Sequence, residues 1–223
     1  MIQSYKNNAY YTHQPYLIEM LKNTNGNILE CGCGDGSTLI IKEEIKNTNR
    51  KLVSIESNLE WFNKYKDLAN ASHELYYINA GNNDTMETGE TWIQFIKSNI
   101  LDDFDIVFID SSPWLSRVAC LNHYLNQSKI IIIHDFDYFP NNNILGFVTS
   151  KERKYYKGKY HEKITCNLDS VVKNYKLFYP PDEYFLGMTG PPTLICSNIM
   201  STTEFQSLMD IIEPNIDAYY KSL

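Results

Sequence analysis

The chain has 223 residues, of which 43% are hydrophobic, enough for one good-sized core and one domain. Its net charge is -7 and it has no strongly basic stripe, which argues against a nucleic-acid partner. No apolar run reaches membrane-spanning length, and the first residues lack the hydrophobic segment of a signal peptide. Five cysteines without a Cys-x-x-Cys pair indicate a reduced, cytoplasmic protein.

The first predicted element is a helix over residues 15–22, which opens with proline and carries apolar residues at helical spacing. A short apolar strand follows, and residues 30–38 then read E-C-G-C-G-D-G-S-T. Glycines at alternate positions allow a tight turn and the close approach of a ligand to the backbone. A dinucleotide-binding loop would carry a third glycine at the position of Ser37. The spacing therefore argues against an NAD-binding enzyme.

Strands and helices alternate after this turn. The predicted strands cover residues 51–56, 74–79, 104–110 and 129–135, and the predicted helices cover residues 58–68, 85–100 and 113–125. Four consecutive isoleucines at 130–133 indicate a strand that is buried on both faces. This alternation is typical of βαβ units in a doubly wound sheet.

The alternation stops after residue 135. Residues 136–163 form an aromatic and polar excursion, with a short helix predicted at 142–148 and a solvated loop at 151–159. Strands are then predicted at 175–179 and 192–197, and because their connection is too short for a crossover helix we expect an antiparallel pair. A helix from residue 203 to 212 is expected to end before Pro214.

The predicted fold class is α/β: a doubly wound, mostly parallel seven-stranded sheet with an antiparallel edge strand and helices on both faces. We expect one domain over residues 1–223. It divides into an N-terminal helical lead (1–26), a ligand-binding core (27–135), a substrate-side insertion (136–174), and the edge strands with the C-terminal helix (175–223).

Polar residues end five of the predicted strands, namely Glu30, Glu56, Asn79, Asp110 and Asp135. In a parallel sheet these positions meet along the carboxyl edge, where such folds bind ligands. A buried acid is costly unless it is paired, so several acids on one edge favour a binding site over solvated strand ends.

The glycine turn and the acidic strand ends resemble the class I, Rossmann-like S-adenosylmethionine (SAM) methyltransferases, in particular small stand-alone O-methyltransferase-like proteins. The resemblance covers residues 27–135 and implies SAM as the cofactor. It places Glu30 near the methionine amino group, Gly32 and Gly34 against the methionine and ribose, and Glu56 on the ribose hydroxyls. The other cofactor-binding positions it implies are Ser37, Ser57, Asn79, Ala80 and Asp110.

The resemblance also implies that Asp110, His134 and Asp135 carry the chemistry, with His134 as the natural general base. Similar O-methyltransferases hold Mg²⁺ on two carboxylates and an amide, so an Mg²⁺ site on Asp110, Asp135 and Asp137 is an open alternative, with His134 as another candidate for the third ligand. The chain departs from that pattern, because Phe136 stands where the amide would be and no lysine closely follows Asp110.

The predicted function is SAM-dependent O-methylation of a small hydroxylated acceptor, such as a sugar or a phenolic metabolite. The alternative is a binding or scaffold protein that keeps the methyltransferase fold without turnover. We expect a small-molecule partner, with no nucleic acid and no membrane. The sequence does not predict the oligomeric state or the identity of the acceptor.

Overall fold

A computed structural model describes residues 9–83, 85–101, 103–136, 149–156, 159–166, 171–180 and 192–222. The main helices are α1 (Gln14–Lys22), α2 (Thr38–Ile45), α3 (Leu59–Tyr65), α4 (Met86–Asn99), α5 (Trp114–Tyr124) and α6 (Thr202–Ser222). Two short 3-10 helices are η1 (Ala9–Tyr11) and η2 (Lys66–Leu68). The strands are β1 (Ile28–Cys31), β2 (Leu52–Glu56), β3 (His73–Tyr77), β4 (Ile106–Ile109), β5 (Ile130–Ile133), β6 (Thr149–Tyr156), β7 (Lys159–Cys166), β8 (Asn174–Phe178) and β9 (Thr193–Ser197).

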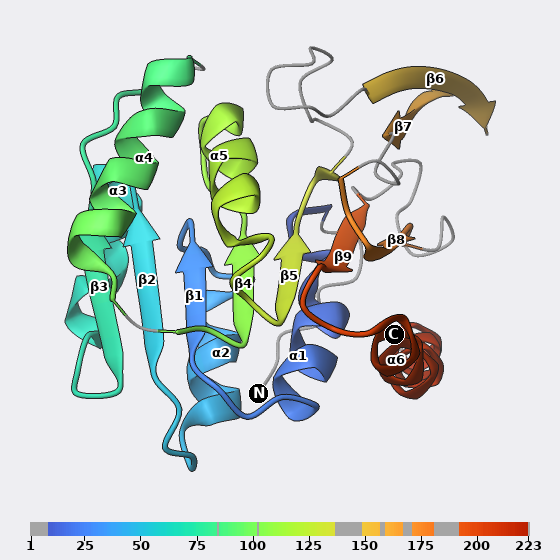
Figure 1. The fold of residues 1–223 in the computed structure, drawn as a ribbon, viewed down its shortest axis with the longest axis horizontal. Helices are drawn as coiled ribbons and strands as arrows, with labels where there is room; N and C mark the ends of the chain where they lie inside the picture. Colours follow the sequence, from blue (N-terminus) through green and yellow to red (C-terminus); the bar gives the residue numbers. More distant parts are fainter. Residues whose placement is uncertain are drawn as a thin grey trace.

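In the described residues, seven strands form one sheet in the order β3-β2-β1-β4-β5-β9-β8 (Figure 1). The pairs from β3 to β5 are parallel, whereas β9 is antiparallel to both of its neighbours. The predicted seven-stranded, mostly parallel sheet is confirmed. The antiparallel strand β9 lies one position in from the edge, and β8 forms the edge itself.

Both faces of the sheet are covered by helices, as predicted. Ile131 and Ile133 face a core shared with α4 and α5, while Ile130 and Ile132 face a core shared with α1, α2 and α6. All four isoleucines are fully buried, which explains the uninterrupted apolar run in the sequence. Burying each such side chain contributes about 1.5–3 kcal/mol.

Two elements in the last third of the chain differ from the prediction. Helix α6 continues through Pro214 to Ser222, because Ile216 and Tyr220 beyond the proline are buried in the core. The predicted loop at residues 151–159 is wrong, since β6 and β7 pair as a separate antiparallel hairpin. The short helix predicted at 142–148 lies outside the described residues.

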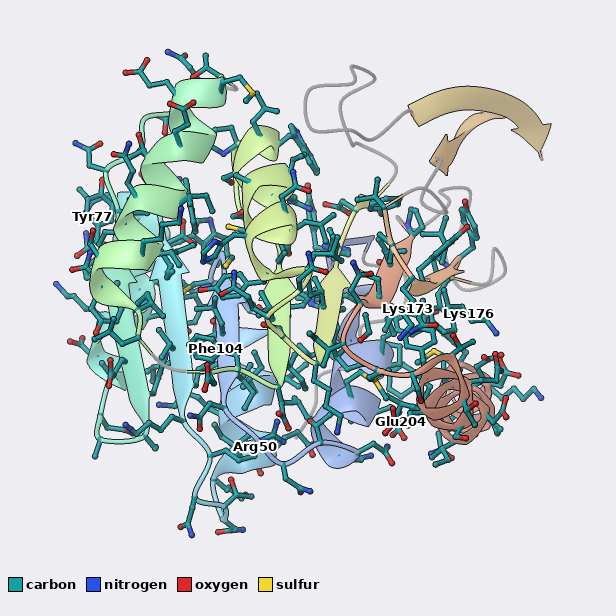
Figure 2. The ribbon with its side chains drawn as sticks, viewed as in Figure 1. Arg50, Tyr77, Phe104, Lys173, Lys176 and Glu204 are labelled. Atoms are coloured by element: carbon teal, nitrogen blue, oxygen red, sulfur yellow. The ribbon has the colours of Figure 1, made fainter. Side chains whose placement is uncertain are left out.

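Arg50 lies at the edge of the sheet opposite to the strand ends that carry the predicted site (Figure 2). Its guanidinium donates hydrogen bonds to the carbonyl oxygens of Leu21, Thr24 and Gly26, at 2.7, 3.1 and 2.6 Å. These bonds fix the loop between α1 and β1. They therefore hold the C-terminal end of α1 in place while the other end of that helix reaches the carboxyl edge.

Candidate functional site

The glycine turn follows β1 directly and passes close to the end of β4. Gly32 has a φ of 95°, and a Cβ there would lie 2.6 Å from the Asp110 carbonyl oxygen. Only glycine fits this position, because L side chains rarely adopt such a φ and the neighbouring atoms are backbone. The turn thus brings the ends of β1 and β4 together, as the sequence predicts.

Glu30 lies beneath this turn and is fully buried. Its carboxylate accepts hydrogen bonds from the hydroxyls of Ser37 (2.6 Å), Thr38 (2.9 Å) and Ser54 (2.7 Å). Burial raises the pKa of Glu30 to about 7 in spite of these donors. Glu30 thus stabilises the end of the turn through its hydrogen bonds with Ser37 and Thr38. Its predicted contact with the methionine amino group of the cofactor stays a prediction.

Glu56 joins the glycine turn to the start of α3. One of its carboxylate oxygens accepts from the Cys33 amide at 2.7 Å, and the other accepts from the Asn58 amide at 2.6 Å. Burial raises its pKa, and the side chain keeps lone pairs for further donors. Asn79, just beyond β3, is exposed, and Ala80 beside it is half-buried. The Ser57 hydroxyl donates to the Ser112 carbonyl at 2.8 Å.

The ends of β4 and β5 carry a cluster of charged groups. Arg117 on α5 pairs with Asp110 at 2.8 Å, and Nδ1 of His134 lies 3.2 Å from the other Asp110 oxygen. Nε2 of His134 lies 3.3 Å from Asp135 and 3.1 Å from the Thr12 hydroxyl. His134 therefore contacts both of the other residues predicted for chemistry, Asp110 and Asp135.

The charges of this cluster shift its pKa values in different directions. Burial alone would raise the pKa of Asp110, but the charges of His134 and Arg117 outweigh it and hold that pKa below its ordinary value. Burial works to lower the pKa of His134, yet Asp110 and Asp135 together raise it. Burial raises the pKa of Asp135 against the attraction of His134. Shifts of this kind are typical of functional sites.

Asp135 has a φ of 53°, in the left-handed region. Aspartate tolerates this conformation better than most residues, although it still stores strain. The backbone therefore turns sharply at the end of β5, directly after His134. Such strain at a strand end beside a charged cluster is a recurring feature of binding and catalytic sites.

A cavity of about 380 Å³ opens above this edge, a size in the range of small-molecule sites. It joins the glycine turn, from Cys33 to Ser37, to Asp110, Arg117, His134 and Asp135. Its remaining lining residues are Tyr10, Tyr11, His13 and Trp61. These four carry no motif, and the sequence gives no signal that they reach the site.

His13 begins the first turn of α1 and is buried beside the charged cluster. Its Nε2 lies 3.1 Å from the Gly36 carbonyl oxygen, and its ring centroid lies 4.3 Å from that of His134. Burial, with the charge of His134, lowers the pKa of His13 to about 3, so the ring is neutral. The preceding residue, Thr12, accepts a hydrogen bond at its carbonyl from the Tyr220 hydroxyl on α6, at 3.3 Å.

The predicted Mg²⁺ site stays a prediction. Asp110 and Asp135 lie at one site, but their oxygens face Arg117 and His134. Asp137 lies outside the described residues. The described carboxylates are thus engaged by nitrogen groups, which are not the surroundings that Mg²⁺ prefers.

No family model and no curated protein matches the chain. Among solved structures, it is similar to an O-methyltransferase from Bacillus cereus in complex with SAH, at 15% identity and a TM-score of 0.43, over 71% of this chain and 80% of that one. It is also similar to human methyltransferase-like protein 13 in complex with SAH (9% identity, TM-score 0.44, 95% of this chain and 92% of that one). A third, the plantazolicin methyltransferase BamL, is 20% identical with a TM-score of 0.38; the match covers 59% of this chain and 46% of BamL.

The strand order, with five parallel strands followed by an antiparallel pair, is that of the class I, Rossmann-like SAM-dependent methyltransferases. The chain has this fold, and its glycine turn and acidic strand ends lie at the carboxyl edge of the parallel strands, where open α/β sheets bind ligands. The residues fit a SAM-like ligand, because the cavity is lined by the glycine turn from Cys33 to Ser37, and Glu56, which binds the Cys33 amide of that turn, keeps lone pairs for further donors. None of the described helices is both long and apolar enough to cross a membrane.

Proposed function

We propose that this protein is a SAM-dependent methyltransferase that methylates a hydroxyl oxygen of a small acceptor, such as a sugar or a phenolic metabolite. The observation that carries the proposal is a single cavity with two kinds of wall. One wall is the glycine turn, and the other is the cluster of Asp110, His134 and Asp135. A cofactor held at the first wall would present its reactive end to a molecule held at the second.

SAM, when bound, supplies an electrophilic methyl group on a sulfonium. The backbone at Gly34 lies open to the methionine part of such a ligand, since even a Cβ there would meet no atom closer than 3.8 Å. Glu56 would accept hydrogen bonds from the ribose hydroxyls with its remaining lone pairs. Asn79 and Ala80 at the end of β3, with Ser57, would lie on the adenine side.

Nε2 of His134 would receive the proton of the acceptor hydroxyl, and the Asp135 carboxylate, 3.3 Å from Nε2, would stabilise the charge that forms. Asp110 orients the His134 ring through Nδ1, and Arg117 in turn holds Asp110. Methyl transfer depends mainly on alignment of the oxygen with the methyl group, so a rigid cluster is an advantage. The residues of the insertion 136–174 are proposed to complete the acceptor side.

Titration calorimetry with SAM and with SAH tests the cofactor part of the proposal, and methyl transfer to sugar and phenolic acceptors tests the reaction. Asp135→Asn should abolish turnover while SAM binding persists, because the cofactor wall is untouched. Asp67→Asn, on the exposed surface of η2, is the matched control and should leave both intact. Full activity of Asp135→Asn would remove Asp135 from the mechanism.

The alternative, a binding or scaffold protein without turnover, is favoured by one observation. Asp110 and Asp135 are already engaged by Arg117 and His134, so the cluster satisfies itself. A folded protein that binds SAM but methylates no acceptor would support this alternative. Heat from neither SAM nor SAH would contradict the enzyme, and enhanced NADH fluorescence would then point to a nicotinamide cofactor.

A further inference from the structure

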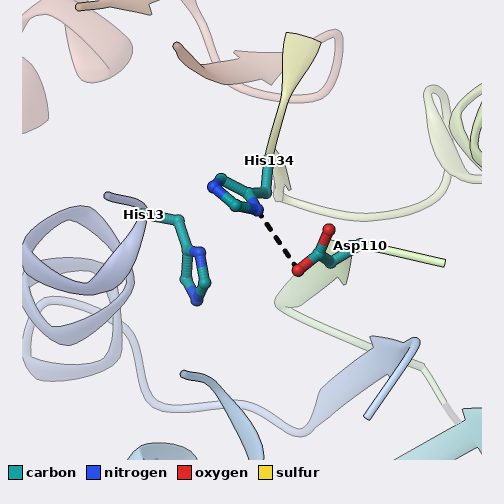
Figure 3. Close-up of side chains that lie close together, drawn as sticks. All are labelled: His13, Asp110 and His134. Atoms are coloured by element: carbon teal, nitrogen blue, oxygen red, sulfur yellow. Dashed lines mark hydrogen bonds and ion pairs between the residues drawn. The ribbon is translucent and has the colours of Figure 1, made fainter. Parts of the chain in front are cut away.

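The side chains of His13, Asp110 and His134 lie close together (Figure 3), and all three line the cavity. They come from the start of α1 and from the ends of β4 and β5, so residues far apart in the sequence meet at one point. One ligand atom from each side chain lies within 4.8 Å of the other two. Two imidazoles and a carboxylate are a common ligand set for divalent transition metals.

The hydrogen bonds of His13 leave one nitrogen available. The Gly36 carbonyl can only accept, so Nε2 of His13 carries the hydrogen and donates it. Nδ1 then bears a lone pair, and this buried atom has no hydrogen-bond partner among the residues that the structure describes. A buried polar atom without a partner is uncommon and calls for an explanation. A histidine that ligates a metal usually donates its other N–H to a carbonyl, as His13 does.

Both ring nitrogens of His134 also face polar groups. Its Nδ1 faces Asp110, while its Nε2 faces the Asp135 carboxylate at 3.3 Å. An ion between Nδ1 and the Asp110 oxygen would take the place of the shared proton. Nε2 would then donate to Asp135, which gives the carboxylate–histidine–metal relay found around many metal ions.

The charges around the three side chains also favour a cation. With both histidines neutral, Asp110 and Asp135 supply two negative charges and Arg117 supplies one positive charge. Arg117 binds one oxygen of Asp110 at 2.8 Å, and the other oxygen faces His134. The carboxylate can thus bridge the guanidinium and an ion.

We propose that His13, Asp110 and His134 form a binding site for a divalent transition metal ion, with Zn²⁺ as the ion to test first. Metal bonds of about 2.1 Å bring ligand atoms to about 3.5 Å from one another, so the widest pair must close by about 1 Å. Two nitrogen ligands favour Zn²⁺, Co²⁺ or Fe²⁺ over Mg²⁺, which prefers oxygen. Unlike the predicted Mg²⁺ site, this site includes His13 and leaves out Asp135.

The consequence of this site rests on the proposed function, although the binding itself does not. An ion here would keep an open position toward the cavity and lower the pKa of a hydroxyl bound to it. In the loaded protein the ion would take over from His134 the task of acidifying the acceptor. In the metal-free protein His134 keeps that task.

The experiment uses the whole chain, stripped of metal with a chelator and titrated with ZnCl₂ by calorimetry. We expect one ion per chain, and about 100-fold weaker binding or more in His13→Ala, since even indirect partners of a ligand are worth 10–100-fold. Asp110→Asn keeps the shape of the side chain and should also weaken binding. His123→Ala, on α5 and outside the cluster, is the matched control and should bind like the wild type.

Circular dichroism of each variant checks that it folds. Should His13→Ala fail to fold, the absorption spectrum of the Co²⁺-loaded wild type and the anomalous scattering of a Zn²⁺-soaked crystal decide the matter. Tetrahedral Co²⁺ bands and a peak between the three side chains support the site. The absence of Zn²⁺ binding, or equal binding by wild type and a folded His13→Ala, overturns it.

The two proposals can fail separately. A protein that binds Zn²⁺ in this pattern but neither SAM nor SAH would keep the metal site and refute the methyltransferase. A protein that transfers methyl groups but binds no Zn²⁺ would refute the metal site alone.

Discussion

Replacing Glu30 with glutamine tests how the buried carboxyl group under the glycine turn affects stability. The pKa of Glu30 is raised from 4.5 to about 7, mainly by burial. Because the folded pKa lies above the unfolded one, the folded state holds the proton more tightly. The contribution of Glu30 to the free energy of unfolding is therefore greatest below about pH 4.5, and it is lost as the pH rises through about 7.

The loss follows from the two pKa values. The difference between a pKa of 4.5 and one of about 7 corresponds to a loss of about 3 kcal/mol in the free energy of unfolding. This loss is complete at pH values well above 7. Glutamine has nearly the same shape, carries no charge, and still offers an oxygen to the hydroxyls of Ser37, Thr38 and Ser54. We therefore expect Glu30→Gln to be up to about 3 kcal/mol more stable than wild type at pH 8, and nearly equal to it at pH 4.5.

Urea unfolding at several pH values between 4.5 and 8 measures this difference. Glu90→Gln, at an exposed position on α4, is the matched control and should track the wild type at every pH. A Glu30→Gln protein that is less stable than wild type at pH 8 would refute the reasoning. It would mean that the three hydroxyls stabilise the ionised carboxylate by more than its burial costs.

Three further predictions concern the turn, the cofactor wall and α6. Gly32→Ala should lower the free energy of unfolding by about 3 kcal/mol or more, because its Cβ would meet the Asp110 carbonyl at 2.6 Å, whereas Gly34→Ala should change it by less than about 1 kcal/mol. Equal losses in chemical unfolding would contradict this. Glu56→Ala should weaken SAM binding about 100-fold or more in calorimetry by removing two charge-assisted hydrogen bonds, and unchanged affinity would place the ribose elsewhere. Pro214→Ala should raise the unfolding midpoint, with a gain of about 1–2 kcal/mol, because the helix recovers a backbone hydrogen bond; a lower midpoint would show that the proline shapes α6 for its packing.

Local patterns predicted much of the fold. Strand β5 follows from its four isoleucines, because burial on both faces permits no polar residue. The helix predicted from residue 58 begins with an asparagine, a residue type favoured at helix N-caps, and the Asn58 side chain does accept hydrogen bonds from the amides of Glu60 and Trp61. The turn between β1 and α2 follows from its glycines, since the φ of Gly32 excludes other residues.

Patterns that depend on distant contacts were harder to interpret. Pro214 is usually a sign that a helix ends, but packing of Ile216 and Tyr220 outweighs the missing hydrogen bond. The sequence does contain a signal for the hairpin β6–β7, because only two residues, one of them a glycine, separate its strands. The many charged residues of this stretch favoured the interpretation as a loop.

The candidate site likewise contains residues that local patterns predict and one that they do not. Asp110, His134 and Asp135 were predicted to meet because parallel strands end along one edge. His13 was not predicted, because nothing in the sequence around it indicates that α1 carries it across to β4 and β5. Only the placement of α1 against the sheet, which no local pattern encodes, makes it part of the cavity.

Thr12 joins three distant parts of the chain at this cavity. Its carbonyl receives the Tyr220 hydroxyl of α6, while its own hydroxyl lies 3.1 Å from Nε2 of His134. Thr12 lies just before α1, so these two contacts connect the N-terminal end of α1 with α6 next to the imidazole of His134. A displacement of α6 can therefore reach the His134 ring through the contacts of one residue, Thr12.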